Sequence, residues 1–573
     1  MTDWMTTSSV EERQRVLDLT PNEREEELKK WIKESNLSHS MKIDIAVGFN
    51  KLELYGVNVV KHILAGKETS SKPFGKSGLT SFNTITYAMC NLTHGSRALS
   101  EHLYDGYTHH IENYLNEDIV PFLADKHDYV LLKEFSDVWN SHKVLTNWMY
   151  KLFNQIDRTH VGLHKGKKSI TSCALHCFYR IVFHDVVRKR VRECVLHFMA
   201  QERSGVNVDR DQLKSCVQMF ELMGMAANVS DVKSIAEATN LPTDISIYRM
   251  ELERPLLEAS AEYYSLQRVQ LLGECSMLSY FAQVERAVRG EETRVKAYLN
   301  PATLPRIQAT VMQELMIVPS DRVKESFHGI LRSADSAITL DSEAFPSDFC
   351  AHIKTVFALL LQIQDLPAMV SSSTTDAEDS SSSMFTATAT GATGTVANND
   401  DLMNAFVEEF EKFLLEGVLK IRDMRASYSA PSAEGEGEAK QVTALTGSAK
   451  AAADIEFIKN CISFNRRVSL LLSECLQSFS QLRHCLQGAI TKLMGGEIDA
   501  GSADPVTPTD MLVVYLDKCL RKDNKDQAAV SEADMDAVLV ESVHLFKTIR
   551  DKDVFIEVFE LFGCCVRPPF VPS

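Results

Sequence analysis

The sequence predicts an all-α protein, and three observations support this class. Helical periodicity runs through most of the 573 residues, with apolar positions recurring at intervals of three and four. No alternating strand pattern bounded by an Asn-Gly or Asp-Gly turn is visible. Hydrophobic residues make up 45% of the chain and charged residues 24%, close to the average for globular proteins. The chain can therefore bury a large core between helices.

The helix expected from Val187 onward shows the pattern clearly. Its apolar positions fall at steps of three, four and one, which places them on one face of a helix. Arg188, Arg190 and Arg192 lie off that stripe. One face should therefore be buried and the other solvated. Similar amphipathic stretches lie near 47–65, 79–92, 97–120, 126–158, 248–272, 274–299, 304–317 and 402–424.

The next helix carries both a start and a stop signal. Asp209 and Gln212 have the spacing of a capping box, in which each side chain accepts a hydrogen bond from a backbone N–H at the helix start. Apolar residues then continue from Leu213 at i, i+3, i+4 and i+7. We expect Gly224 to end this helix, because glycine commonly follows a helix end.

Three segments interrupt the helical pattern, at 371–400, 427–440 and 495–508. The first is rich in Ser, Thr, Ala and Gly and has little to bury, so we expect a flexible insertion. The chain should then consist of a long helical body to about 424 and a smaller helical unit from about 453 to 562. Many helices without a fixed short period suggest stacked helical units.

The charge of the chain limits its partners. The formal net charge is −17, which argues against general nucleic-acid binding, because phosphate contacts need an excess of Lys and Arg. Residues 151–200 nevertheless hold more basic than acidic side chains. This basic patch could steer an acidic partner or act as an import signal, although such a run is more often a solvated helix face.

The cysteines and the start of the chain indicate the compartment. Thirteen cysteines are scattered along the chain, and the first residues lack an apolar leader. We interpret the cysteines as reduced thiols of a cytoplasmic and/or nuclear protein. Apolar runs such as residues 355–364 are shorter than the ~20 residues that a spanning helix needs. We therefore expect no membrane segment.

Two motifs resemble ligand sites only in part. Gly75-Lys76-Ser77 matches the end of a phosphate-binding loop, but Ser70 stands where its first glycine should be and no strand precedes it. We favour a loop between two helices. Cys173, His176 and Cys177 would share one helix face, but structural zinc usually takes four ligands. A half-buried helix face is the favoured interpretation.

A catalytic site is not indicated either. The adjacent Cys564 and Cys565 could form a catalytic thiolate, but no glycine elbow, oxyanion pattern or linked histidine accompanies them. We predict no catalytic residue, no cofactor and no metal. Composition and periodicity alone thus indicate a large helical scaffold or interaction protein.

Three blocks of residues carry a more specific pattern. The densest lies at 152–224 and contains the run QERSGVNVDR at 201–210, followed by Leu213-Lys214 and Met219-Phe220. The second block comprises Tyr248, Glu251, Pro255-Leu256-Leu257, Tyr263-Tyr264, Tyr280, Val284-Glu285, Glu291-Glu292, Arg294, Tyr298-Leu299 and Thr303. The third comprises Met511-Leu512, Tyr515-Leu516-Asp517, Leu520-Arg521-Lys522, Leu545-Phe546 and the run IRDKDVF at 549–555.

In this order the blocks resemble the cullin family, the scaffolds of multisubunit ubiquitin ligases, with Val206 where the family usually has Glu. The resemblance implies an elongated stack of three five-helix cullin repeats followed by a partial helical bundle. Recurrent residues in such a scaffold should stiffen it and should not form a catalytic site. The implied domains are an N-terminal extension at 1–43, repeats at 44–162, 163–300 and 301–424, a linker at 425–452 and a partial four-helix bundle at 453–573.

The resemblance also implies an adaptor-binding surface in the first repeat. Cullins bind a Skp-like or BTB-fold adaptor through the second and fifth helices of this repeat. The second-helix pattern falls at 82–90, where Tyr87 and Cys90 match and Asn83 and Thr86 replace the usual Tyr and Val. The helix at 79–92 could equally be core. The fifth helix, expected at about 142–158, would present Asn147, Tyr150, Lys151 and Asn154.

The family binds a RING-box subunit and carries a neddylated lysine in its carboxy-terminal part. After Phe555 this sequence reads to Pro568-Pro569 and ends at Ser573, so we expect the RING dock to be absent and the chain alone to assemble no active ligase. A rigid scaffold would act by fixing the distance between substrate and ubiquitin donor. A tethering or trafficking rod and a thiol-dependent ligase using Cys564 or Cys565 are the alternatives.

Overall fold

The computed structural model confirms the all-α class. Within the described residues, the only other regular structure is a small antiparallel hairpin of β1 (Thr93–His94) and β2 (Arg97–Ala98). The interruptions predicted at 371–400, 427–440 and 495–508 lie almost wholly outside those residues. The structure describes residues 9–35, 37, 43–66, 72–94, 97–162, 166–227, 245–333, 345–372, 400–428, 447–495, 508–520, 532–549 and 552–562.

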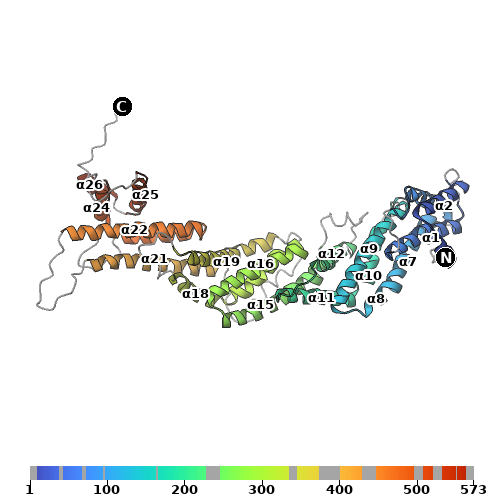
Figure 1. Cartoon of the computed structure of the whole chain (residues 1–573), viewed down its shortest axis with the longest axis horizontal. Coiled ribbons are helices and arrows are strands. Elements are labelled where there is room, and N and C mark those ends of the chain that lie inside the picture. The colour runs from blue at the N-terminus through green and yellow to red at the C-terminus, as the bar shows by residue number, and fades with distance from the viewer. Residues whose placement is uncertain are drawn as a thin grey trace, which may run out of the picture. The chain divides into compact units, whose positions relative to one another are not determined.

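The chain divides into two compact units (Figure 1). Unit 1 contains residues 1–263 and 290–307, and unit 2 contains residues 264–289 and 308–573. Unit 1 includes α1 (Val10–Asp18), α2 (Pro21–Glu34), α4 (Ile45–Leu52), η2 (Glu53–Val57), α5 (Asn58–Leu64), α6 (Gly78–Cys90), α7 (Leu99–Tyr114), η3 (Leu115–Ile119), α8 (Val120–Ala124), α9 (Asp128–Ile156), η4 (Asp157–Val161), α10 (Ile170–Ile181), α11 (Asp185–Arg203), α12 (Arg210–Ala227), α14 (Ser246–Tyr248), η5 (Arg249–Glu253) and η6 (Pro301–Thr303). Three further helices, α15 (Arg254–Glu274), α16 (Met277–Tyr298) and α17 (Leu304–Met312), contribute residues to both units.

The first two helices belong to unit 1 and pack on it. Helix α2 begins with a capping box, because Thr20 and Glu23 each accept a hydrogen bond from the other's backbone N–H, and Pro21 occupies the first helical position. Its residues Leu28 and Ile32 are buried, and α2 contacts α6. The segment expected as an N-terminal extension therefore supplies part of the core of unit 1.

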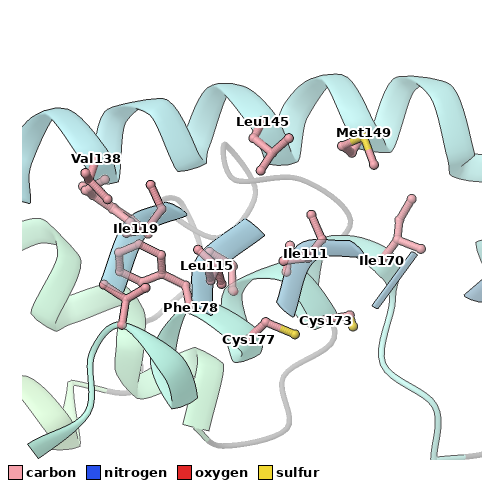
Figure 2. Packing of buried hydrophobic residues seen from close by; sticks show 14 of the residues in the cluster. Ile111, Leu115, Ile119, Val138, Leu145, Met149, Ile170, Cys173, Cys177 and Phe178 are labelled. Carbon is pink, nitrogen blue, oxygen red and sulfur yellow. The ribbon is translucent and has the colours of Figure 1, made fainter. Parts of the chain in front are cut away.

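Helix α9 is the central element of unit 1. It runs without a break over Asp128–Ile156, so it begins well before the expected fifth helix at 142–158. Its buried face packs on α7 and α10, and η3 packs on α10; Figure 2 shows Val138, Leu145 and Met149 above Ile111 and Phe178. Removing a large apolar side chain from water contributes about 1.5–3 kcal/mol each, so this cluster holds the four elements together.

Helices α11 and α12 test two predictions made from spacing. In α11, Val187, Val191 and Met199 are buried as expected. Helix α12, by contrast, continues three residues beyond Gly224 to Ala227, so the expected stop is wrong. Gly224 is buried inside the helix, and a helix interior tolerates glycine at modest cost when tertiary packing supports it.

The cap of α12 is half of a capping box. Asp209 Oδ1 accepts hydrogen bonds from the backbone N–H groups of Asp211 at 3.1 Å and Gln212 at 3.2 Å. The Gln212 side chain does not complete the box, because its Oε1 accepts no hydrogen bond. Its amide N–H donates to the Tyr129 hydroxyl at 3.5 Å. The start signal is therefore confirmed in its N-cap part alone.

Unit 2 is built around α21 and α22, which lie side by side (Figure 1). Helix α21 also contacts α18 and α23, and α24 contacts α22 and α26. Apolar and aromatic contacts join them, such as Phe327 with Phe406 at 5.4 Å and Phe546 with Phe555 at 4.8 Å between ring centroids. The further elements are η7 (Gln313–Ile317), α18 (Ser320–Arg332), α19 (Ser347–Ser372), α21 (Asp400–Tyr428), α22 (Gly447–Glu474), α23 (Ser480–Met494), α24 (Pro508–Leu520), α25 (Glu532–Thr548) and α26 (Lys552–Phe562).

One helix passes the length and composition test for a membrane span. Residues Ser347–Leu366 of α19 are long and apolar enough, which corrects the expectation that this run is too short. Its apolar side chains are nevertheless buried within unit 2, among them Ile353, Phe357 and Ile363. Core helices of globular proteins meet the same test, so the finding is weak evidence for a span.

Candidate functional site

Helices α6 and α9, which carry all eight predicted adaptor-binding residues, pack directly against each other. The rings of Phe82 and Phe153 meet edge to face at 5.6 Å between centroids. The Thr86 hydroxyl lies within hydrogen-bond distance of the Phe82 carbonyl oxygen at 3.1 Å and the Leu152 carbonyl oxygen at 3.4 Å. These contacts fix the two helices as one rigid pair.

The start of α6 is held by a carboxylate. Gly75 adopts φ +73° in the turn before the helix, a conformation that favours glycine. The Ser77 hydroxyl donates to the carboxylate of Glu25, which also pairs with Lys29. These two contacts lower the pKa of Glu25 to about 2. The turn that resembled a phosphate loop therefore joins two helices, as favoured, and packs against a side chain of α2.

Two of the eight predicted residues are buried. Thr86 is 0% exposed and Cys90 6% exposed, and both side chains pack within the helix pair. Burial raises the pKa of the Cys90 thiol to about 11, so this thiol stays protonated at neutral pH. A buried side chain does not contact a partner, and these two residues therefore belong to the core and not to the surface that the resemblance implied.

The other six residues are accessible to different degrees. Tyr87 is 43% exposed, Asn147 is exposed, and Asn83, Tyr150, Lys151 and Asn154 are partly exposed. On α9, Asn147, Lys151 and Asn154 follow one another at i, i+4 and i+7, so they share one face. Tyr150, three residues after Asn147 and four before Asn154, lies at the edge of the same face and packs against the core.

Sequence reasoning missed Trp148 and Val144, which lie beside these residues on α9. Trp148 is partly exposed and carries the Lys151 ammonium over its ring at 4.2 Å. The Trp148 ring also contacts the ring of Phe74, in the turn before α6, at 5.4 Å between centroids. Val144 is 41% exposed. The sequence did offer a signal for Trp148. This tryptophan lies on the helix expected to form the interface, three residues before Lys151, and Trp is enriched at binding hot spots.

The α6–α9 surface is defined here as Tyr87, Val144, Asn147, Trp148 and Lys151, with Asn83, Tyr150 and Asn154 at its margin. It combines two aromatic rings, one aliphatic side chain and one cation. Apolar and aromatic anchors with a polar rim are the usual composition of a protein interface.

The run QERSGVNVDR at 201–210 spans the end of α11 and the turn to α12. Gly205 has φ +89°, and the N–H groups of Gly205 and Val206 donate to the carbonyls of Glu202 and Gln201, each at 3.0 Å. This is a Schellman motif, in which a left-handed glycine closes the helix end. The motif turns the chain towards α12 and leaves the charged side chains of Glu202 and Arg203 directed at α15 and α16.

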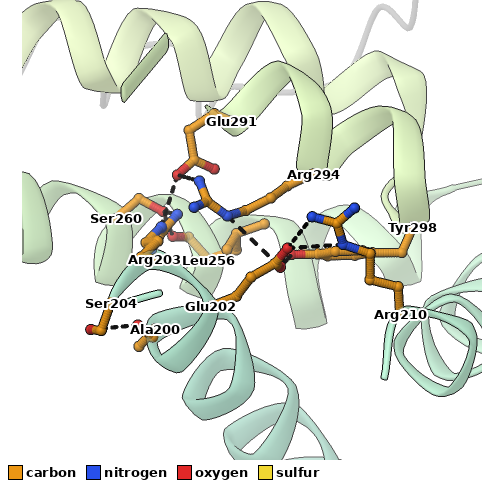
Figure 3. Close-up of polar contacts among 10 residues, drawn as sticks. All are labelled: Ala200, Glu202, Arg203, Ser204, Arg210, Leu256, Ser260, Glu291, Arg294 and Tyr298. Atoms are coloured by element: carbon orange, nitrogen blue, oxygen red, sulfur yellow. Dashed lines mark hydrogen bonds and ion pairs between the residues drawn. The ribbon is translucent and has the colours of Figure 1, made fainter. Parts of the chain in front are cut away.

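Those side chains form a buried network, drawn in Figure 3. The Arg203 guanidinium donates to Glu291 Oε1 at 2.8 Å and to the Ser260 hydroxyl at 2.7 Å. Arg294 donates to the same Glu291 oxygen at 2.8 Å. The side chains of Arg203 and Glu291 are 3% and 0% exposed, so this pair depends on its mutual contacts to offset the loss of hydration.

Glu202 forms the second half of the network (Figure 3). Its carboxylate accepts from Arg210 at 2.6 Å and from the Tyr298 hydroxyl at 2.8 Å, and lies 3.8 Å from Arg294. Burial and the neighbouring Glu202 carboxylate raise the pKa of Tyr298. The run thus joins the α11–α12 turn to α16, which agrees with a stiffening role.

A shallow hollow of about 360 Å³ lies beside the network. Its charged groups, Glu202, Arg210 and Arg294, are already engaged with one another. The arrangement therefore supplies structural contacts between elements of unit 1. The hollow is lined by Glu202, Gly205, Val206, Asn207, Arg210, Gly290, Thr293 and Arg294.

Three arginines of the basic patch at 151–200 make contacts inside unit 1. Arg188 and Arg192 form ion pairs with Glu251 at 3.2 and 3.6 Å. Arg190 donates to backbone carbonyls at the end of α8, including that of Ala124 at 3.2 Å. The expected solvated face is therefore only partly correct, since these arginines connect helices.

The structure describes Cys173 and Cys177, the candidate zinc ligands, but not Cys564 and Cys565, the candidate catalytic thiols. Cys173 and Cys177 are buried on α10, and Cys173 Sγ lies 3.2 Å from the Thr108 hydroxyl, so the half-buried helix face is confirmed. Within the described ranges, no cluster of three or more His, Cys, Asp or Glu side chains is arranged to hold a metal ion. Cys564 and Cys565 lie outside those ranges.

Comparison with known proteins adds independent evidence. The family model described as "Cullin alpha solenoid domain" matches residues 58–561. The chain is 22% identical over 506 residues to putative cullin-like protein 1 of Arabidopsis thaliana, covering 88% of this chain and 57% of that protein. It is 27% identical over 293 residues to putative cullin-like protein 2 of the same plant, covering 51% and 72%. It is 24% identical over 286 residues to cullin-1 of Oryza sativa subsp. japonica, covering 50% and 35%.

The packed helices and their buried polar junctions define an all-α scaffold protein. The family match covers most of the chain. This chain therefore belongs to the cullin family, whose members are non-catalytic scaffolds that generally bind adaptors and RING-box proteins. The chain spans little more than half the length of the first of these relatives.

Proposed function

We propose that this chain is a scaffold subunit of a multisubunit ubiquitin ligase and binds a Skp-like or BTB-fold adaptor through the α6–α9 surface. The observation that carries the proposal is the accessible face of α9, where Val144 is 41% exposed and the Lys151 ammonium lies over the partly exposed Trp148 ring. Trp and Tyr side chains supply much of the binding free energy at protein interfaces. The process in which this scaffold subunit takes part is ubiquitin-dependent protein catabolism.

Two unsatisfied amides support the same surface. The side-chain carbonyl oxygens of Asn83 and Asn154 are buried without a hydrogen-bond partner. An unsatisfied buried acceptor costs free energy. Rotation of either amide when the adaptor binds would bring its oxygen within reach of a hydrogen-bond donor of the adaptor. The free-energy cost of the unsatisfied acceptor would then be removed in the complex.

The mechanism of such a scaffold is positional. It holds a bound substrate receptor at a fixed place and so raises the effective concentration of the substrate near the ubiquitin donor. The rigid α6–α9 pair and the buried network around Arg203 supply the stiffness that this role needs. Family membership favours this role over a tethering or trafficking rod.

The proposal is tested by pull-down of the full chain with a panel of purified Skp-like and BTB-fold adaptors. Lys151→Glu changes a partly exposed side chain and Tyr87→Ala an exposed one. Each should weaken binding of the cognate adaptor at least ~10-fold, as expected for hot-spot residues. Lys133→Glu is the matched control, because Lys133 is exposed on the same face of α9, about 27 Å away along the helix.

The outcomes separate clearly. Binding that falls for Lys151→Glu and persists for Lys133→Glu supports the proposal. Binding of no adaptor in the panel by the wild-type chain, or equal binding by all variants, contradicts it. Recovery of membrane-tether subunits from cells in place of an adaptor would favour the tethering rod.

We also propose that the chain resides in the cytoplasm and/or the nucleus. All eleven cysteines of the described ranges are free, which suits a reducing compartment. Fluorescence microscopy of the tagged chain checks this, and a secretory location would contradict it.

A further inference from the structure

Helices α1 and α2, named here the N-terminal strap, lie against one of the two helices of the proposed adaptor surface. Helix α2 contacts α6, and α1 contacts η2 and α5. The family match begins only at residue 58, so the strap lies outside the matched domain. Helix α6 therefore contacts α9 and also a segment that the family model does not contain.

The contact between α2 and α6 is fixed at the start of α6. The Ser77 hydroxyl donates to the Glu25 carboxylate. A Cβ added to Gly78 would lie 3.9 Å from Glu25 Cβ, so the two backbones approach closely at this point. The first turn of α6 thus lies beside the second turn of α2.

Contacts with α4 and η2 show the direction in which α2 runs. The Tyr55 hydroxyl donates to Glu27 at 2.6 Å. Four residues further along α2, the Lys51 ammonium lies 5.9 Å from the centroid of the Trp31 ring. Increasing residue numbers in α2 therefore meet decreasing numbers in α4 and η2, and the two segments are antiparallel.

The same segment is antiparallel to α6. A Cβ added to Gly48 would lie 2.7 Å from Met89 Sδ, and one added to Gly56 would meet the Phe82 ring. Because α2 and α6 are each antiparallel to α4 and η2, they run parallel to each other.

The buried faces of α2 and α6 therefore match along their length. Ile85 lies seven residues after Gly78, on the same face of α6. Ile32 lies seven residues after Glu25, on the same face of α2. Both isoleucines are buried. Since the two helices are parallel and meet at Glu25 and Gly78, α2 covers the face of α6 that carries Ile85.

Few apolar side chains hold the strap. Within α1 and α2, both described in full, the buried apolar residues are Val16, Leu28 and Ile32. Charged groups supply much of the remaining contact, such as Arg13 with Glu53 at 3.0 Å. Aromatic rings, in contrast, join α6 to α9. Polar contact surfaces within a chain are typical of parts that separate and close again.

We propose that the N-terminal strap competes with the adaptor for α6 and so regulates the α6–α9 surface, an inference that rests on the proposed function. In the closed form α2 covers the Ile85 face. In the open form Ile85 joins Tyr87 and the accessible face of α9 in one larger surface. Only the open fraction binds the adaptor, so the apparent Kd exceeds the intrinsic Kd by the inverse of that fraction. The coupling is reciprocal, so a bound adaptor keeps the strap open.

A double variant of the full chain locks the strap. In Glu25→Cys/Gly78→Cys the two Cβ atoms would lie 3.9 Å apart, within the range of about 3.5–4.5 Å that a disulfide needs. Mild oxidation closes the bond, and peptide mass spectrometry verifies it. The oxidised form should bind the Skp-like or BTB-fold adaptor at least ~10-fold more weakly than the reduced form of the same protein. Wild type taken through the same oxidation controls for its native thiols.

A second variant opens the strap. Ser77→Glu places a carboxylate against that of Glu25, and like charges repel, whereas an acidic side chain at the start of α6 suits the helix dipole. Hydrogen exchange of the α2 backbone should become at least ~10-fold faster, and the adaptor should bind more tightly than to wild type. Asn22→Glu is the matched control, because it adds the same charge at an exposed position of α2. If circular dichroism shows that Ser77→Glu is unfolded, the two redox forms of the locked variant decide.

The outcomes distinguish the inference from the proposed function. Adding the adaptor to wild type should speed hydrogen exchange in α2. Slower exchange would make α2 part of the binding surface and overturn the competition. Equal adaptor binding by the oxidised and reduced forms of the locked variant would also overturn it and leave the proposed function intact. Absence of adaptor binding by every form contradicts the proposed function and the inference with it.

Discussion

Two helix junctions in this chain each contain an Arg–Glu ion pair, but one pair is buried and the other is exposed. In unit 1 the end of α11 joins α15 and α16 through Arg203 and Glu291, whose side chains are 3% and 0% exposed. In unit 2, α18 joins α21 through Arg332 and Glu416, which are 46% and 34% exposed. The first junction places charge in the core, and the second places it at the rim of an aromatic core.

The difference shows where the chain depends on individual polar groups. A buried pair leaves an uncompensated charge in a low-dielectric environment when one partner is removed. An exposed pair leaves a charge that water solvates. The run at 201–210 is therefore expected to be intolerant of single changes, whereas the ion pairs between α18 and α21 should tolerate them.

The largest predicted effect is at the buried junction. Arg203→Met should lower the free energy of unfolding of unit 1 by about 3–5 kcal/mol, because Glu291 then loses a buried partner. All four tryptophans lie at or before position 148, so tryptophan fluorescence during urea denaturation reports on unit 1. The double variant Arg203→Met/Glu291→Leu should recover much of the loss. A cost below about 1 kcal/mol for the single variant would contradict the buried-charge account.

A smaller effect is predicted where backbone and ring approach closely. Gly56 in η2 has no room for a side chain, since an added Cβ would lie 2.3 Å from Phe82 Cε2. Gly56→Ala should destabilise unit 1 by about 1–3 kcal/mol through overpacking against α6. Gly273→Ala is the control, because nothing lies within 4 Å of the added Cβ. The control should be neutral or stabilising in urea titrations.

The third prediction concerns pH and the start of α6. Lys29 and Ser77 lower the pKa of Glu25 from 4.5 to about 2, so its stabilising contribution is complete above about pH 4.5 and is lost as the pH falls towards 2. Glu25→Gln should lower Tm at pH 7, and its difference from the wild type should shrink by pH 3. Glu26→Gln, at a position where the side chain is 76% exposed, should show no such trend. An equal Tm for Glu25→Gln and wild type at pH 7 would refute it.

The smallest effect is predicted at the exposed junction. Arg332→Gln should cost no more than about 0.5–1 kcal/mol in the stability of unit 2 and should lose that effect at high salt. Circular dichroism during urea denaturation at two ionic strengths measures it. A loss as large as that of Arg203→Met would remove the distinction between the two junctions.

Helical periodicity predicted the fold class and most elements, because apolar spacing along a helix is a local property of sequence. The buried positions Val187, Val191 and Met199 follow directly from it. The predicted end at Gly224 failed because the packing of α12 overrides the weak local preference of one glycine.

The candidate site was predictable at the level of helices and less so at the level of residues. The resemblance selected α6 and α9, but Thr86 and Cys90 face the core of that pair. Trp148 was missed because its exposure depends on Phe74, which reaches it from the turn before α6. Spacing along one helix does not show which neighbour covers which face.

The sequence by itself determined the all-α class, the cullin family and the run at 201–210 as a special feature. Only the tertiary structure decided that Glu202 contacts α16, that Arg203 contacts α15, and that Glu25 holds the turn before α6. The physical reason is that periodicity and capping act within a few residues. Burial and charge pairing depend instead on which distant segments are brought together.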